Sequence, residues 1–195
     1  MASASAARIL AFAGSTRTDS FNKKLVRVAK GGAEAAGAEV TLLDLRDYPM
    51  PVYDGDLETA EGLPDNARKL KHLMLEHDGL LIASPEYNSS ISAVLKNTID
   101  WISRPEPDVA PLAHFDGKVA GIVSASPGAL GGLRGLVQLR AILSNIKVLV
   151  IPEQLAVPGA HDAFDDSGAL KDAARQQAVE HIGRRVAEVA GRLRG

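Results

Sequence analysis

Residues 8–22 read RILAFAGSTRTDSFN, and this stretch decides the fold. Its apolar run, residues 8–13, stops at Gly14, which is the pattern of a short buried strand. A polar loop follows, and from Lys23 onward apolar residues recur at the spacing of a helix. A buried strand that passes through a polar loop into a helix opens a βαβ unit, so the stretch predicts an α/β protein.

The same alternation continues along the chain. After the strand at 8–13, further strands are predicted at 39–45, 79–84, 118–124 and 147–151. Helices are predicted at 23–36, 64–77, 91–103, 130–145 and 171–193. Loops or irregular structure are predicted at 46–63, 104–117 and 152–168. Five β-then-α units predict a parallel sheet covered by helices on both faces, in a single domain that spans residues 1–195.

Composition limits the classes of function. The chain has 195 residues, of which 46% are hydrophobic, and 22 basic against 24 acidic residues give a net charge of −2. That balance gives no electrostatic argument for nucleic acid or an anionic membrane as a partner. Cysteine is absent, which excludes disulfides, thiolate metal sites and cysteine nucleophiles. The five histidines are scattered without the spacing of metal ligands, so no metal site is predicted.

The first residues carry no targeting pattern. Residues 1–7 lack a charged segment followed by an apolar one, so no signal peptide is predicted, and we expect these residues to be disordered. The apolar run 9–13 is far too short to span a membrane. Together with the lack of cysteine, which is compatible with a reducing compartment, this favours a cytoplasmic protein without a membrane span.

The loop after the first strand, Gly14–Asn22, is suited to a phosphate. It combines one guanidinium, Arg17, with the hydroxyls of Ser15, Thr16, Thr18 and Ser20. It leads into a helix N-terminus, where free backbone amides and the helix dipole favour an anion. Plain capping by Ser20 or Asp19 is the alternative. Neither G-x-G-x-x-G nor G-x-x-x-x-G-K-[ST] is present, so the loop fits a terminal phosphate such as that of FMN better than a pyrophosphate.

Two further loops follow predicted strands. Residues 84–90 contain Tyr87 and several amides that suit a flavin ring, although Pro, Asn and Ser are also ordinary turn residues. Residues 124–132 offer hydroxyls, amides and glycines that let a ligand approach closely, although a flexible connection would look the same. In open parallel sheets ligands bind beyond the carboxyl ends of strands, which is where these loops are predicted to lie.

Several motifs, taken in order, resemble the NAD(P)H-dependent FMN reductase family, a group of quinone, chromate and azo-dye reductases. They are G-S-x-R-x-x-S-x-N at 14–22, S-P-E-Y-N at 84–88, L-K-N-T-I-D-W at 95–101, G-G-L-R at 131–134 with L-R at 139–140, and A-F-D at 163–165. The resemblance implies a flavodoxin-like, doubly wound five-stranded sheet in the order 2-1-3-4-5. It also implies bound FMN, NAD(P)H as co-substrate, and a dimer or tetramer.

The resemblance also implies which residues bind the cofactor. The phosphate end would be held by Ser15, Arg17, Ser20, Phe21 and Asn22. The ring would be held by Pro85, Glu86, Tyr87 and Asn88. For the third loop, the candidates Ser124, Ala125, Ser126 and Gly128 come from the hydroxyls, amides and glycines of the loop itself. No residue is assigned a catalytic role, because the flavin carries the chemistry.

The predicted activity is transfer of hydride from NAD(P)H through FMN to a small acceptor, by a ping-pong mechanism. The acceptor would be a quinone, free flavin, chromate or an azo compound; the alternative is a flavodoxin-type electron carrier without NAD(P)H turnover. Self-association is predicted because two helices carry more apolar side chains than one sheet face needs, unless all of them pack on the sheet. These side chains are Ile91, Leu95, Ile99, Trp101, Leu133, Leu136, Leu139 and Ile142.

Overall fold

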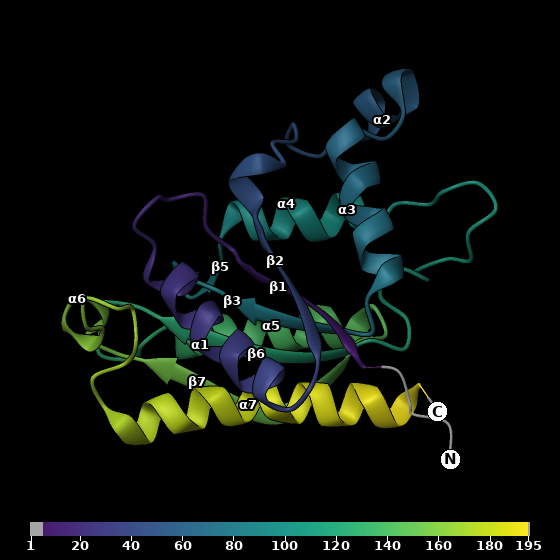
Figure 1. Ribbon diagram of the computed structural model, residues 1–195. Helices are drawn as coiled ribbons and strands as arrows, with labels where there is room; N and C mark the ends of the chain where they lie inside the picture. Colours follow the sequence, from purple (N-terminus) through teal and green to yellow (C-terminus); the bar gives the residue numbers. More distant parts are fainter. Residues whose placement is uncertain (1–5, 195) are drawn as a thin grey trace, which may run out of the picture.

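The computed structural model describes residues 6–194 and shows a parallel sheet between two layers of helices (Figure 1). Its elements are β1 (Arg8–Ala13), α1 (Phe21–Ala35), β2 (Glu39–Asp44), η1 (Leu45–Asp47), α2 (Gly55–Glu61), α3 (Asp65–Glu76), β3 (Gly79–Ala83), β4 (Glu86–Tyr87), β5 (Ser90–Ile91), α4 (Ala93–Ile102), β6 (Val119–Ala125), α5 (Leu133–Asn145), β7 (Leu149–Val157), α6 (Ala160–Ala163) and α7 (Ala173–Leu193). The large sheet has the order β2-β1-β3-β6-β7 with parallel neighbours, which confirms the predicted order 2-1-3-4-5.

Each face of the sheet has its own hydrophobic core. In β1, Ile9 and Ala11 belong to the core under α1 and α7, whereas Leu10 and Phe12 belong to the core under α3, α4 and α5. Successive side chains of a strand point to opposite faces, so a central strand with helices on both sides must be apolar throughout. This explains why the central strands appear in the sequence as continuous apolar runs.

The structure differs from the sequence prediction where apolar periodicity is missing. The segment predicted as a loop at 46–63 contains most of η1 and all of α2, a helix that buries none of its residues. Residues predicted to be irregular beyond Ile151 continue β7 to Val157. A register shift against β6 accompanies this extension, because Ala120 pairs with Val150 but Ile122 pairs with Gln154. Pro152 lies in the shifted stretch, where a missing amide does not interrupt a regular ladder.

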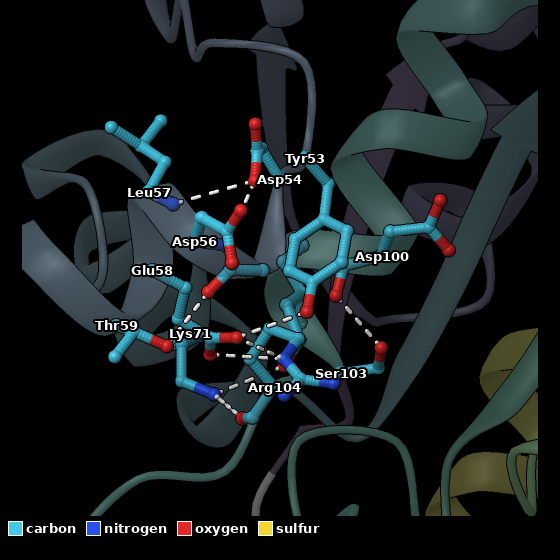
Figure 2. A network of polar contacts seen from close by, with 12 residues as sticks. Tyr53, Asp54, Asp56, Leu57, Glu58, Thr59, Lys71, Asp100, Ser103 and Arg104 are labelled. Carbon is cyan, nitrogen blue, oxygen red and sulfur yellow. Dashed lines mark hydrogen bonds and ion pairs between the residues drawn. The ribbon is translucent and has the colours of Figure 1, made fainter.

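Two segments predicted as loops are fastened by polar contacts at the C-terminal end of α4 (Figure 2). The carboxylate of Glu58 in α2 accepts hydrogen bonds from Arg104 Nε at 2.8 Å and from the Tyr53 hydroxyl at 3.0 Å. Lys71 in α3 donates from Nζ to the carbonyls of Ile102 at 3.0 Å and Arg104 at 2.7 Å. Burial lowers the pKa of Lys71 below its ordinary value. Polar contacts thus add to the small apolar cluster around Trp101 in this region.

The apolar residues cited for self-association mostly pack inside the chain. Ile91, Leu95, Ile99, Trp101, Leu136 and Leu139 are buried. That basis for the prediction is wrong for these six, because α4 and α5 direct them into the cores or against Tyr53. Large exposed apolar side chains at the start of α5 are Leu130, Leu133 and Val137. Self-association remains a prediction, which light scattering would test.

Among the described residues, backbone pairing in the large sheet begins at Ala7, one residue before β1. Of the residues expected to be disordered, 1–5 lie outside the described part of the chain. Ala7 is buried, and its carbonyl accepts the amide of Glu39 at 2.9 Å, so the ladder with the β2 segment begins before β1. Within residues 6–194, no helix combines the length and apolar character that crossing a lipid bilayer requires.

The network in Figure 2 predicts that Lys71 is a stability determinant. Lys71→Ala should lower the free energy of unfolding by about 2–4 kcal/mol, because two carbonyls lose a charged donor inside the protein. Lys69→Ala, on the exposed side of the same helix, should change it by less than about 0.5 kcal/mol. Urea unfolding followed by circular dichroism measures both. Equal effects of the two substitutions would contradict this account of Lys71.

Candidate functional site

Three loops at the carboxyl ends of β1, β3 and β6 converge on one hollow. These strands are neighbours in the sheet, so their ends meet at the same edge, at the left of Figure 1. The hollow measures about 230 Å³. Its lining comprises Ser15, Arg17, Ser20, Phe21, Asn22, Pro85, Glu86, Tyr87, Ala125, Ser126 and Pro127. The structure therefore brings together residues of all three loops singled out in the sequence.

The loop before α1 leaves its donors free for an anion. Ser20 occupies the N-cap position, but its side chain makes no capping hydrogen bond, although the residue is only 5% exposed. Within residues 6–194, the Arg17 guanidinium makes no hydrogen bond or ion pair, and it lines the hollow. The amides of Phe21 and Asn22, the first two of α1, have no acceptor within their own helix, whereas the amide of Lys23 donates to the carbonyl of Ser20 at 3.0 Å. Because the hydroxyl of Ser20 is not used for capping, these donors favour a bound phosphate over the capping alternative.

Asn22 does not offer its side chain to a phosphate. Its Nδ2 donates to the carbonyl of Ala125 at 2.9 Å, and its Oδ1 accepts the amide of Ala125 at 3.0 Å. Both polar ends of the side chain are therefore engaged in the interior. Ala125 was predicted to bind the cofactor, but its amide already donates to Asn22. The structural role of Asn22 and Ala125 is to join the first loop to the end of β6.

The ring loop is a small hairpin, formed by β4 and β5. Asn88 and Ser89 occupy its two turn positions with φ values of 51° and 65°. Positive φ at both central positions is the geometry of a tight hairpin turn and suits Asn. Residues 88–89 thus form a turn, as the alternative interpretation of this loop predicted. Asn88 lies at the exposed tip of the hairpin and does not line the hollow. Tyr87 lines the hollow and is 55% exposed, so it is available to a planar ligand.

Glu86 directs its carboxylate toward helix α5. Its Oε2 accepts the amide of Gly135 at 3.0 Å, and its Oε1 accepts from Arg134 Nε at 3.1 Å. Burial raises the pKa of Glu86, but the bonds from the Gly135 amide and Arg134 outweigh it, so the pKa lies below its ordinary value. The carboxyl is therefore ionised at neutral pH, and both of its oxygens accept hydrogen bonds from the first turn of α5.

The third loop contributes fewer groups than predicted. Ser124 is fully buried, and its hydroxyl donates to the carbonyl of Ser84 at 2.6 Å. Ser126 lines the hollow and its Oγ accepts the amide of Gly128 at 3.3 Å, whereas Gly128 itself does not line it. Gly132 has a φ of 95°, and a Cβ there would lie 1.9 Å from the Ser124 hydroxyl. Ser124 and Gly128 thus shape the loop without facing the hollow.

Sequence reasoning missed three residues that hold the phosphate loop from outside. Arg46, in η1 directly after β2, donates from Nε to the carbonyl of Thr16 at 2.9 Å. Ser92 donates to the carbonyl of Gly14 at 2.6 Å, and Phe164 stacks on Phe21 with ring centroids 6.2 Å apart. Arg46 could have been found, because it directly follows a predicted strand that neighbours the first. Pro127 was also missed as part of the lining.

The donors present fit FMN. A monophosphate suits Arg17, Ser20 and the first amides of α1, and a planar ring suits the exposed face of Tyr87. Among residues 6–194, no three His, Cys, Asp or Glu side chains gather as they would around a metal ion. Fold and site together define the class: flavodoxin-like α/β proteins whose strand-end loops hold a mononucleotide cofactor.

The chain belongs to the NADPH-dependent FMN reductase family, whose model matches residues 7–162. It is 33% identical over 189 residues to an NAD(P)H-dependent FMN reductase of Pseudomonas aeruginosa, which covers 96% of this chain and 97% of the relative. It is 37% identical over 144 residues to a quinone reductase of Escherichia coli, covering 74% of this chain and 73% of the relative.

A solved structure supports the fold assignment. FerB, a flavoenzyme NAD(P)H:acceptor oxidoreductase of Paracoccus denitrificans, superimposes with a TM-score of 0.80. The match covers 95% of this chain and 98% of FerB, at 24% sequence identity. The flavodoxin-like fold predicted from the motifs is thereby confirmed.

The paired bonds of Asn22 predict a loss of both stability and cofactor binding when they are removed. Asn22→Ala should lower the free energy of unfolding by about 1–3 kcal/mol, because it leaves the buried amide and carbonyl of Ala125 without partners. FMN affinity should fall as well, since the first and third loops are no longer joined. Asn66→Ala removes two exposed bonds, one to the Pro49 carbonyl and one from Lys69 Nζ, and should do neither. Thermal unfolding and flavin fluorescence titration measure the two effects.

Proposed function

We propose that this chain reduces small acceptors, such as quinones, free flavin, chromate or azo compounds, with electrons from NAD(P)H through bound FMN. The observation that carries the proposal is the set of uncommitted phosphate donors at the start of α1, beside the exposed Tyr87. The E. coli relative named quinone reductase supports a quinone among the acceptors. A cytoplasmic location, where NAD(P)H is available, and a homodimer or homotetramer belong to the same proposal.

Different residues of the hollow bind the phosphate and the ring of FMN. Arg17 and the hydroxyls of Ser15 and Ser20 bind the phosphate, together with the amides that open α1. Pro85 and Tyr87 contact the ring, and Ser126 approaches from the third loop. When bound, FMN supplies the redox chemistry by taking two electrons from a reduced nicotinamide and giving them to an acceptor.

The open side of the site explains the proposed kinetics. The three loops line a single hollow, and Tyr87 leaves one side of it accessible to solvent. Nicotinamide and acceptor must then occupy the same place in turn, since both must approach the ring. This order of binding predicts ping-pong kinetics, with parallel lines in double-reciprocal plots.

Arg17 should discriminate FMN from flavins without a phosphate. Arg17→Ala should weaken FMN binding by about 10-fold to 150-fold, because a charge-assisted phosphate contact is worth about 1.5–3 kcal/mol. Riboflavin affinity should be the same in wild type and variant. Arg27→Ala, on the exposed side of α1, is the matched control and should change neither. Equal affinity of the wild type for FMN and riboflavin would contradict a phosphate site.

Direct reduction separates a reductase from an electron carrier. Stopped-flow mixing of the FMN-loaded protein with NADPH or NADH alone should bleach the flavin absorbance, and a quinone added afterwards should restore it. Tyr87→Ala should slow turnover clearly but change the melting temperature little, because the side chain lies at the surface. A fully loaded protein that neither nicotinamide can bleach would favour the carrier instead.

A further inference from the structure

Helix α5 begins without a cap of its own. Its N-cap residue is Gly132, which has no side chain, and its first turn contains no acidic residue. The first amides of any helix need acceptors from elsewhere, and an anion there is stabilised by the helix dipole. Here the acceptor is Glu86 Oε2, which receives the amide of Gly135 from a different loop. The capping group of α5 therefore belongs to the ring loop.

The surroundings of Glu86 are shaped for this contact. A Cβ added at Gly135 would lie 3.3 Å from Glu86 Cβ and 3.3 Å from the carbonyl of Ser90, so the hairpin packs directly on the first turn of α5. The Glu86 side chain is 9% exposed, while its partner Arg134 is 59% exposed. The hydrogen bond from Gly135 to Glu86 is thus buried, whereas the ion pair between Glu86 and Arg134 is exposed to solvent on the Arg134 side.

The hairpin needs such support. β4 and β5 have two residues each, paired Glu86 with Ile91 and Tyr87 with Ser90. A two-stranded hairpin of this size is not stable by itself in water. Its turn residues, Asn88 and Ser89, are exposed. The position of Tyr87 therefore depends on what holds Glu86, its neighbour in the same strand.

We propose that Glu86 is a positioning residue: its carboxylate caps α5 across the gap between two loops and so fixes the ring loop relative to the third loop. The inference rests on the proposed function, in which FMN lies between these loops. Both carboxylate oxygens are engaged by α5, so Glu86 acts on the flavin through the placement of Tyr87 and Ser126, without side-chain contact to the ring.

The experiment compares two substitutions of Glu86 in the full chain. Glu86→Ala removes the acceptor, whereas Glu86→Gln keeps an oxygen that can accept from Gly135. FMN affinity should fall about 10-fold or more in Glu86→Ala and return to within about 3-fold of wild type in Glu86→Gln. Asp54→Ala is the control, because it removes a two-bond cap from α2, far from the loops, and should leave FMN affinity unchanged.

Hydrogen exchange of the FMN-free protein gives the second measurement. The Gly135 amide should exchange about 10-fold faster or more in Glu86→Ala, and close to the wild-type rate in Glu86→Gln. This readout involves no flavin, so it tests the cap even if the wild type fails to bind FMN, which would overturn the proposed function alone. If Glu86→Ala does not fold, Glu86→Asp, whose carboxylate is one methylene short of Gly135, replaces it.

Two outcomes would overturn the inference. Unchanged FMN affinity in Glu86→Ala would show that the ring loop needs no cap. Weakened FMN binding with normal exchange at Gly135 would show that Glu86 contacts the flavin itself. In that second case, Glu86→Gln should also shift the visible absorption of bound FMN, whereas a positioning role leaves that spectrum as in wild type.

Discussion

The site depends most on the two hydrogen bonds between the Asn22 side chain and the backbone of Ala125. They join the first turn of α1 to the end of β6, although β3 lies between β1 and β6 in the sheet. Because both bonds are buried, breaking them removes the side-chain partner of two buried backbone groups, which costs free energy. Ser92, Ser124 and Glu86 add further links between the same loops. The loops consequently form one connected frame around the hollow.

Within this frame, some polar side chains are hydrogen-bonded to the protein, and others remain available to a ligand. Asn22, Ser124 and Glu86 spend their hydrogen bonds on the protein, and the carboxylate of Glu86 is neutralised by Arg134 and the dipole of α5. Arg17 and Ser20 remain uncommitted among the described residues. The free groups at the hollow are thus donors, and the charge among them is positive. Such a preorganised cradle favours an anion without any rearrangement of the loops.

Apolar patterning predicted the parallel sheet and its ligand loops, because central strands such as β1 are apolar on both faces and ligand loops follow their carboxyl ends. The order of the strands came from the resemblance to the FMN reductase family. The patterning missed α2, which buries nothing, and the end of β7, where Pro152 breaks the usual strand signal. Within the site, sequence reasoning could not tell Arg17, whose guanidinium bonds to none of residues 6–194, from Asn22, whose side chain is hydrogen-bonded to Ala125. That distinction depends on a backbone group 103 residues away, and no local pattern encodes such a partner.

The same frame constrains how acceptors are selected. Among the residues that line the hollow, Glu86 is the one carboxylate, histidine is absent, and both oxygens of Glu86 are engaged by α5. No carboxylate or imidazole there is poised to exchange a proton with a bound acceptor. Under the proposed function, Pro85, Tyr87 and Pro127, which line the hollow, would discriminate between acceptors by shape and apolar contact. A site built in this way suits planar acceptors of different chemistry, provided that they fit beside Tyr87.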